Sequence, residues 1–352
     1  MNLPARLLLP LLFTLFACGP DLETGLTDAE EAAAALEVSV DPGVPIAQNL
    51  NGLGELSGLV GSQQHASFYW ALRDSLAGDR PSRTRLYAVK IAKRQLQPFS
   101  GASGASPSRE FTFAPSISIE NINWEDLAVG PDVRTGTGWS LYIGDVGNNP
   151  PKGEDYGRRN LYQIYQLQEP NPVGGSSVIP ALQATWRFKY PTTATGRYPN
   201  CEVLFHLDGK IYLITKEREP RIFRLPDGFA QSPSGVHTLV PVTNGTVKGV
   251  VGAVSRPSYA SYSWDRKRFM VGGHTQFHVY SMTQHSLTGD AFVRAMLLTA
   301  GKNQDTTKRI AHNPPAALNT EGGTYEPGTK NVILGTESKL LFHWPRANIE
   351  AP

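Results

Sequence analysis

NWEDLAVG (residues 123–130) and LYIGDVGNN (residues 141–149) each have the pattern of a short β-strand with acids at one end. Glu125 and Asp126 stand before the apolar residues of the first phrase, and Asp145 stands after those of the second. Aromatic and branched aliphatic residues favour strands, whereas Gly and Asn favour the turns that join them. Because similar pairs of phrases recur along the chain, the stretch indicates a repeat.

The repeat has five recognisable copies, which begin at Glu55, Glu125, Glu202, Val251 and Glu321. Each copy has a short strand, a turn rich in Gly, Pro or Asp, an apolar second strand and a third strand that often carries Tyr or Phe. A four-stranded propeller blade needs roughly 40 to 50 residues, and longer spacings allow insertions. We therefore predict an all-β protein, a β-propeller with five blades, or six if an insertion hides another. A two-sheet sandwich is the alternative, but it would not repeat one phrase five times.

The fourth strand of each blade is expected between the phrases. Candidates are FTFA (111–114), ATWRFKY (184–190), VHTLVPV (236–242) and AMLLTA (295–300). The last phrase has no candidate after it. A strand from the start of the domain, either LEVSV (36–40) or IAQNL (46–50), is expected to complete that sheet and close the ring.

The N-terminal residues predict export and a lipid anchor. Residues 1–17 place Arg6 before an apolar run that is too short to span a bilayer, as in a secretory signal. The run ends in LFAC, which resembles the bacterial lipobox and assigns Cys18 as the acylated first residue of the mature protein. An ordinary cleaved signal and an uncleaved anchor are the alternatives. Membrane lipid is the expected partner, and Gly19 after the cysteine favours the outer membrane of the cell envelope.

The predicted domain organisation is a signal peptide at 1–17, an acidic tether at 18–45 and the propeller at 46–350. Residues 19–50 contain seven acids and neither Lys nor Arg, which is typical of a solvated tether. Only Cys201 remains after Cys18, so the mature chain has no intrachain disulfide and Cys201 is expected to be a buried apolar residue. The basic residues are scattered singly, which argues against nucleic-acid binding. A monomer is expected.

Acids recur at the strand ends of the repeat. The first strands open at Glu55, Glu125, Glu202 and Glu321, and the second strands end at Asp74, Asp145, Lys216 with Glu217, His274 and Glu337. The innermost strand of every blade lines the axis of a propeller, so we expect these side chains to converge there. Hard oxygen ligands suit Ca²⁺ or Mg²⁺. The candidate metal ligands are Glu125, Asp145, Glu202, Glu321 and Glu337; the candidate channel or ligand-binding residues are Glu55, Asp74, Lys216, Glu217 and His274.

A structural role for these acids is the alternative to a metal site. Carboxylates at strand ends accept hydrogen bonds from the backbone in turns, and a repeat copies such features from blade to blade. GDVGNN lacks the spacing and the closing Glu of an EF-hand loop. The repeat does not explain Asp126, and no sequence feature requires a redox cofactor.

Five phrases together resemble a family of bacterial secreted β-propeller proteins, which are similar to propeller domains described as esterase-like or phytase-like. They are ELSGL (55–59), WEDLAVG (124–130), LYIGDVGNN (141–149), IYLITKE (211–217) and LGTES (334–338). The resemblance covers roughly residues 52–345 and implies a propeller. The chain departs from the family pattern at Asn123, at Asn200-Cys201 and at 251–254, where acids are missing, and these departures weaken the case for catalysis.

Two functions follow as hypotheses. The first is a ligand-binding or scaffold module at the envelope, whose partner is an envelope protein or a small ligand. The alternative is a divalent-metal-dependent hydrolase of phosphate or carboxylic esters, in which axial carboxylates hold the metal. Neither G-x-S-x-G nor H-E-x-x-H occurs in the chain.

Overall fold

The computed structural model describes thirteen segments of the chain. They are residues 38–39, 44–47, 53–74, 84–101, 104–148, 159–191, 199–217, 220–242, 256–265, 267–282, 287–297, 307–312 and 319–344. All of them belong to one compact unit, Leu36–Pro352. The expected signal peptide and Cys18 lie outside the described residues. Within the described segments, no helix is both long and apolar enough to cross a membrane.

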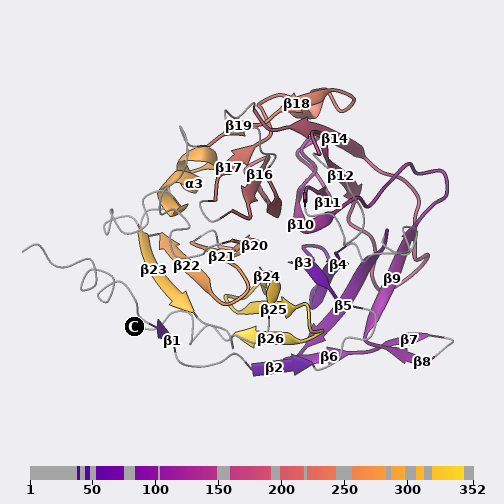
Figure 1. The fold of residues 1–352 in the computed structure, drawn as a ribbon. Helices are drawn as coiled ribbons and strands as arrows, with labels where there is room; N and C mark the ends of the chain where they lie inside the picture. Colours follow the sequence, from indigo (N-terminus) through magenta and orange to yellow (C-terminus); the bar gives the residue numbers. More distant parts are fainter. Residues whose placement is uncertain are drawn as a thin grey trace, which may run out of the picture. The chain divides into compact units, whose positions relative to one another are not determined.

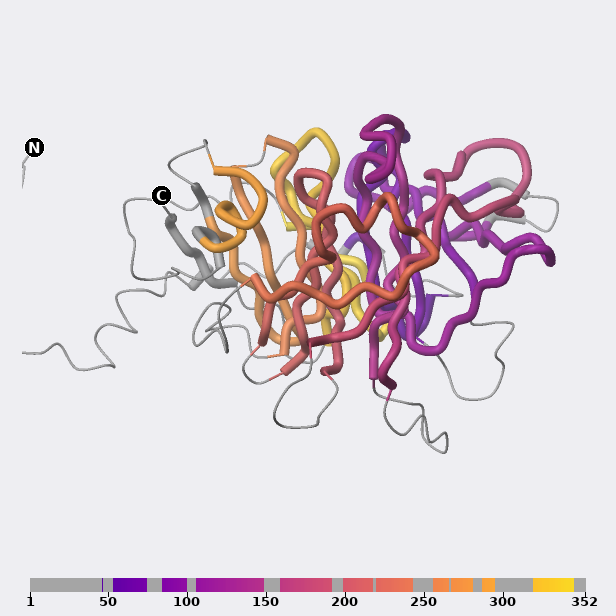
Figure 2. The backbone as a smooth tube through the Cα atoms, turned by 90° about the horizontal axis from the view of Figure 1, so that it is seen from above, coloured from indigo at the N-terminus to yellow at the C-terminus, as the bar shows by residue number. Residues whose placement is uncertain are grey.

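Five small sheets are arranged as a ring around one axis (Figure 1). The fold is a five-bladed β-propeller. The prediction from the repeat is therefore confirmed, and five is the correct number of blades. Figure 2 shows the ring turned by 90°, with the strands crossing its thickness.

Blades 1 and 2 each contain a strand from a later part of the chain at the outer edge. From the axis outward, blade 1 contains β3 (Leu56–Gly61), β4 (Phe68–Arg73), β5 (Leu86–Ala92), β9 (Ser108–Phe113) and β13 (Val178–Ile179), with β6 (Gln95–Gln97) also paired to β5. Blade 2 contains β10 (Trp124–Pro131), β11 (Trp139–Asp145), β12 (Tyr162–Gln168), β14 (Ala184–Lys189) and β18 (Val236–Thr238). A separate hairpin joins β7 (Phe99–Gly101) and β8 (Gly104–Ser106). Both edge strands pair in parallel, so the chain ties neighbouring blades together.

The remaining blades complete the ring. Blade 3 contains β15 (Cys201–Leu207), β16 (Lys210–Thr215), β17 (Ile222–Arg224) and β19 (Val240–Pro241), and the short helix η1 (Phe229–Gln231) lies between β17 and β19 in sequence. Blade 4 contains β20 (Tyr259–Tyr262), β21 (Arg268–Gly272), β22 (Phe277–Met282), β23 (Thr307–His312) and β1 (Val38–Ser39). Blade 5 contains β24 (Thr320–Tyr325), β25 (Val332–Thr336), β26 (Leu341–Trp344) and β2 (Val44–Ala47).

The N-terminal strand closes the ring as predicted. β2 pairs antiparallel with β26, so residues from the start of the domain supply the outer strand of the last blade. Both candidate segments contribute, because β1 lies within LEVSV and pairs in parallel with β23 of blade 4. Closure through distant residues removes an open edge from the ring.

Two predictions of fourth strands need correction. Residues 295–297 belong to helix α3 (Gly289–Leu297), and the fourth strand of blade 4 is β23 instead. Phe292 and Val293 are buried on one face of this helix, and Asp290 lies in its first turn, a pattern that favours a helix. VHTLVPV divides between two blades, as β18 and β19.

The hydrophobic core lies between the blades and is rich in aromatic residues. Trp70, Trp124, Trp186 and Trp344 are fully buried, and rings such as Trp70 and Phe111 meet edge to face. Cys201 is fully buried as expected, and burial raises the pKa of its thiol to about 12. Such a thiol is a poor nucleophile at neutral pH.

Candidate functional site

A β-bulge interrupts the innermost strand of four blades at the same place. The pairing register shifts between Leu56 and Gly58, Trp124 and Asp126, Cys201 and Val203, and Thr320 and Gly322. The residues left out of the pairing are Ser57, Glu125, Glu202 and Glu321. A bulge redirects one side chain relative to the strand, so the repeat supplies three glutamates and one serine to the axis.

These side chains line a small polar cavity, which we call the carboxylate cavity. Its volume is about 50 Å³, and it is lined by Glu55, Leu56, Ser57, Asp74, Glu125, Glu202, Lys216, Glu321 and Glu337. Seven of the ten residues proposed from the sequence therefore meet at one end of the axis. Their roles as metal ligands or ligand-binding groups stay predictions.

Lys216 is the internal cation of this cavity. Its Nζ contacts Oε2 of Glu202 and lies 3.3 Å from Oε1 of Glu321. Burial lowers the pKa of Lys216, but Glu202 and then Glu321 raise it more, so the pKa lies above its ordinary value. Asn200 donates its Nδ2 to Oε1 of Glu202 at 2.9 Å. Lys216 is therefore charged and links blades 3 and 5.

His274 extends the network from blade 4. Its Nε2 lies 2.5 Å from Oε1 of Glu321, and this hydrogen bond is the main cause of the raised pKa of His274. Burial raises the pKa of Glu321, yet His274 and Lys216 together hold it below its ordinary value. Of the three bulge glutamates, Glu321 is therefore the one that is ionised most readily.

Glu125 has the opposite environment. Its side chain is only 3% exposed, and Oγ of Ser57, which has a single proton to donate, lies 2.7 Å from the carbonyl oxygen of Glu125 and 3.2 Å from Oε2. No hydrogen-bond partner of Oε1 is found among the described residues. Burial raises the pKa of Glu125 well above its ordinary value, and the nearby carboxylates of Glu202 and Asp74 raise it further. An acceptor atom is thus buried in the cavity without a donor, which is uncommon in native proteins.

Glu202 completes the carboxylate group with an intermediate environment. Burial raises its pKa to about 7, although Lys216 opposes the shift. The three bulge glutamates therefore line one cavity but differ in their affinity for protons. Environments that separate the pKa values of neighbouring carboxyls are typical of functional sites.

Gly147 makes room for Glu125. A Cβ at this position would overlap Oε1 of Glu125 and Oδ1 of Asn123. The backbone N–H of Gly147 donates to the carbonyl of Asn123, as the N–H of Lys216 does to Asn200 in blade 3. The glycine of GDVGNN thus occupies the position at which blade 3 has Lys216, and only hydrogen fits there beside Glu125.

Asp145 does not line the carboxylate cavity. It is fully buried, and Arg159 donates to both oxygens, with Nη1 2.9 Å from Oδ1 and Nη2 2.7 Å from Oδ2. Asp145 pairs directly with Trp124, the residue before the bulge. Successive side chains of a strand point to opposite faces, so the side chain of Asp145 points away from the face of the next residue, Val146. Burial raises the pKa of Asp145, and Arg159 opposes this. The sequence alignment had treated Asp145 as equivalent to Asp74, which does reach the cavity.

Two further proposed residues lie differently from the alignment. Glu217 accepts two hydrogen bonds from Arg221, at 2.8 and 2.9 Å, and is not among the lining residues. Glu55 lines the cavity but stands two residues before the bulge residue of blade 1, Ser57. Glu55 therefore corresponds to Asn123 of blade 2, and Ser57 corresponds to Glu125. Aligning Glu55 with Glu125 was therefore wrong by two positions.

Asp126, which the repeat does not explain, is a structural link between blades. It is 2% exposed, its Oδ2 accepts the N–H of Leu204 at 2.8 Å, and its Oδ1 accepts the N–H of Leu127 at 2.7 Å. Burial raises the pKa of Asp126 well above its ordinary value, and both backbone hydrogen bonds oppose this shift. Blade 2 is thereby fixed to the innermost strand of blade 3.

The carboxylate oxygens of the cavity suit a hard metal ion, but the cavity already contains a positive charge, the ammonium of Lys216. No group of three or more His, Cys, Asp or Glu residues in the described segments is placed to hold a metal ion. Lys216 lies between Glu202 and Glu321 and occupies the place of a counter-ion. Calcium binding therefore stays a prediction.

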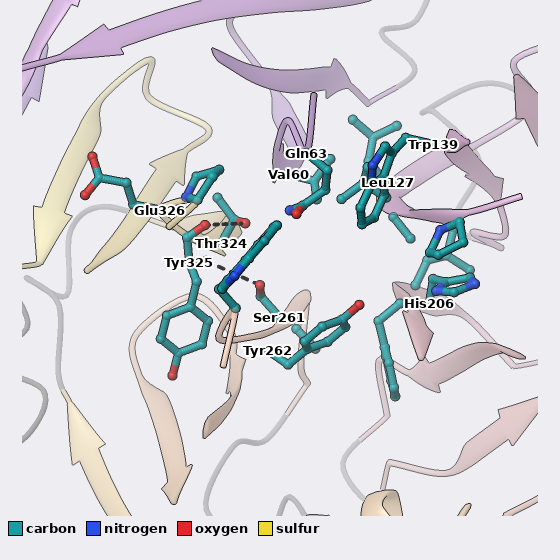
Figure 3. Close-up of a pocket in the computed structure, with 18 residues that line it drawn as sticks. Val60, Gln63, Leu127, Trp139, His206, Ser261, Tyr262, Thr324, Tyr325 and Glu326 are labelled. Atoms are coloured by element: carbon teal, nitrogen blue, oxygen red, sulfur yellow. Dashed lines mark hydrogen bonds between the residues drawn. The ribbon is translucent and has the colours of Figure 1, made fainter. Parts of the chain in front are cut away.

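A second cavity lies at the opposite end of the same five strands and was not predicted from the sequence. It has a volume of about 270 Å³, and we call it the aromatic cavity. Its lining residues include Trp139, Tyr262 and Tyr325, which are labelled in Figure 3, and also Trp264. Tyr262 and Tyr325 both end an innermost strand, whereas Trp139 begins a second strand and Trp264 follows β20. The sequence analysis singled out none of the four.

The sequence matches no family model and no curated protein. Solved structures give remote similarity. The glutaminyl cyclase of Myxococcus xanthus is 12% identical with a TM-score of 0.41, over 87% of this chain and 98% of that chain. The PQQ domain of pyranose dehydrogenase from Coprinopsis cinerea is 9% identical with a TM-score of 0.41, over 86% of this chain and 94% of that chain.

Proposed function

We propose that this propeller is a ligand-binding module of the bacterial cell envelope and that its carboxylate cavity takes the positively charged part of the ligand. The observation that supports the proposal is Oε1 of Glu125, which is buried in the cavity and has no donor among the described residues. A buried acceptor without a partner costs about 1 to 3 kcal/mol, and a bound donor or cation removes this cost.

The charge and the size of the cavity favour a small cationic group. Among the described residues, six acids line the cavity together with one cation, Lys216, so the mutual repulsion of these carboxylates is only partly compensated. A volume of about 50 Å³ fits an ion or an amino group and excludes a larger molecule. Ca²⁺ is the first probe, because carboxylate and hydroxyl oxygens are its preferred ligands.

A thermal melt of the full chain, purified without chelator, tests this proposal. Ca²⁺, Mg²⁺ and methylammonium are added separately, with EDTA as the metal-free reference. At 100 times its dissociation constant, a ligand adds about 2.7 kcal/mol to stability, which raises the melting temperature by several degrees. We expect this shift with one probe and its loss in Glu125→Gln. The control is Glu110→Gln, because Glu110 is half-exposed and lies outside the cavity. An unchanged melting temperature with all three probes would contradict the proposal.

The envelope location belongs to the same proposal and rests on residues 1–18 and on the likeness to bacterial secreted propellers. Acylation of Cys18 would hold the chain at the membrane, since each buried methylene contributes about 0.8 kcal/mol. Labelling of cells with radioactive palmitate tests the anchor. We expect label in the parent chain and none in Cys18→Ser; label in neither chain would argue for an ordinary cleaved signal.

Hydrolysis of phosphate or carboxylic esters is the second candidate function. The cavity brings Glu202, Lys216 and His274 into one hydrogen-bonded network with Glu321, which supplies groups for proton transfer beside an ammonium that attracts anions. A metal, if bound there, would polarise the ester or activate water. We would assay a panel of phosphate and carboxylic esters, with Glu202→Gln as the test variant and Glu110→Gln as its control. Turnover that both variants retain, or no turnover at all, would remove this candidate.

A further inference from the structure

The aromatic cavity is built by all five blades. Its lining residues come from the last residues of the innermost strands, or from just beyond them: Gln63 after β3, Pro131 in β10, His206 in β15, Tyr262 in β20 and Tyr325 in β24. The carboxylate cavity lies at the first residues of these strands, so the two cavities occupy opposite ends of the axis. A cavity shared by every blade is a common place for a ligand.

The described residues around the aromatic cavity carry little charge. Among the described residues that line it there is no Lys or Arg, and the one acid is Glu326. Oε2 of Glu326 already accepts hydrogen bonds from Oγ1 of Thr329 at 2.9 Å and from Nδ2 of Asn331 at 2.6 Å. An anion would therefore find no counter-charge among these residues, and a cation would find a single carboxylate, whose Oε2 already accepts two hydrogen bonds. This lining favours an uncharged ligand.

Aromatic faces and a few polar groups surround the space. Trp139 and Tyr262 are partly exposed, and Trp264 is 58% exposed. The ends of Gln63, Ser261 and Tyr262 lie around the open centre in Figure 3. Such a lining suits a molecule that has an apolar face and a polar edge.

The polar groups favour a hydroxylated ligand over an apolar ring. Oγ of Ser261 accepts the N–H of Tyr325 at 3.3 Å, which leaves its own proton to donate. The amide of Gln63 reaches the carbonyl of Gly61 only at 3.5 Å, and its oxygen is an acceptor. An aromatic hydrocarbon would displace water from these groups without replacing its hydrogen bonds, whereas sugar hydroxyls pair with both kinds of group.

We propose that the aromatic cavity binds a single uncharged sugar ring, whose C–H face lies on an aromatic side chain and whose hydroxyls bond to Gln63 and Ser261. The volume of about 270 Å³ is at the small end of ligand pockets, which span roughly 300 to 1,000 Å³. The site is thus large enough for one ring and its substituents. This inference is independent of the carboxylate cavity and of its cation.

Calorimetric titration of the full chain tests the sugar site. The neutral probes are glucose, galactose and N-acetylglucosamine; glucose 6-phosphate and glucosamine are their charged counterparts, and indole is the aromatic probe. We expect at least one neutral sugar to bind with a dissociation constant of about 1 mM or lower, equivalent to about −4 kcal/mol. Trp264→Ala and Gln63→Ala should each weaken binding about tenfold. Val173→Ala is the control, because Val173 is 65% exposed and does not line the cavity.

Four results would overturn the proposal. They are the absence of binding by all neutral sugars, binding of indole alone, equal binding of the charged and neutral sugars, and equal binding by Trp264→Ala, Gln63→Ala and Val173→Ala. Because Trp264 and Gln63 are both partly exposed, neither variant should unfold the propeller, and a melting curve of each checks this.

Discussion

The same five innermost strands end in two cavities of different chemistry. The carboxylate cavity gathers buried acids around Lys216, whereas the aromatic cavity has a larger volume and one acid that already has partners. At the first end, charged groups are taken out of water and placed close together. At the other end, the side chain of Trp264 stays in contact with solvent, with 58% of it exposed.

This difference indicates which end of the propeller lowers the stability of the folded protein. Like charges in a buried site destabilise each other, and burial disfavours their ionised forms. The pKa of Glu125 is raised well above its ordinary value, and the pKa of Glu202 is raised to about 7. Burial is the largest cause of both shifts, so both reflect this cost. The aromatic end has no comparable group among its described residues. Substitutions at the carboxylate end should therefore change stability much more than substitutions at the aromatic end.

Removal of the internal cation is expected to have the largest effect. Lys216→Met leaves Glu202 and Glu321 without their counter-charge, and breaking a buried ion pair in this way costs about 3 to 5 kcal/mol. Urea unfolding followed by circular dichroism measures the loss as a lower midpoint. If the cavity binds Ca²⁺, the ion should stabilise this variant more than the parent chain, because Lys216 no longer competes for the carboxylates.

Lys210→Met is the matched control. Lys210 also pairs with two acids, Asp227 and Asp290, but Asp227 is 71% exposed, so solvent screens this interaction. Its loss should cost less than about 1 kcal/mol. Equal midpoints for the two variants would show that the carboxylate end is no more costly than an ordinary surface pair.

The repeat made the fold predictable, but it gave the site only in outline. Recurrence of one phrase was sufficient for five blades and for closure by an N-terminal strand, because each blade needs the same alternation of strand and turn. Convergence of acids on the axis also followed from the repeat. The positions of the bulges did not follow from the repeat, because one unpaired residue does not change the composition of a strand. A bulge nevertheless changes which side chain faces the axis. Asp145 was therefore assigned to the axis, although Gly147 occupies the position that Lys216 has in blade 3.

Departures from the repeat were beyond sequence reasoning for a related reason. Helix α3 stands where a strand was expected, and Asp126 bonds to Leu204 in the next blade. Both features depend on contacts between segments that are far apart in the chain. The aromatic cavity is similar, because Trp139 and Trp264 come from different blades and from different positions in the phrase.

Asp126 sharpens the comparison, because it is a buried acid near the carboxylate end whose oxygens both have donors. In Asp126→Asn, one oxygen becomes an NH₂ group that faces the N–H of either Leu204 or Leu127. One backbone donor then loses its acceptor, which costs about 1 to 3 kcal/mol. Thermal unfolding should show a lower melting temperature for Asp126→Asn than for Glu110→Gln, which changes an acid of blade 1 that is half-exposed. A neutral effect would mean that the link between blades 2 and 3 does not contribute to stability.

Glu125 is the adjacent residue, and its variant should change stability in the opposite direction. Glu125→Gln removes a buried carboxylate that has one unpartnered oxygen and a raised pKa, so the melting temperature at neutral pH should increase, by the equivalent of about 0.5 to 2 kcal/mol. Because the native state binds the Glu125 proton more tightly than the unfolded chain does, the parent loses stability as pH rises above the ordinary pKa of glutamate. The advantage of Glu125→Gln should therefore shrink as pH falls toward that value. Melting curves of both chains across this pH range, without added cations, measure the difference. A variant that is less stable than the parent at neutral pH would indicate that Glu125 serves the fold, as Asp126 does, and not a ligand.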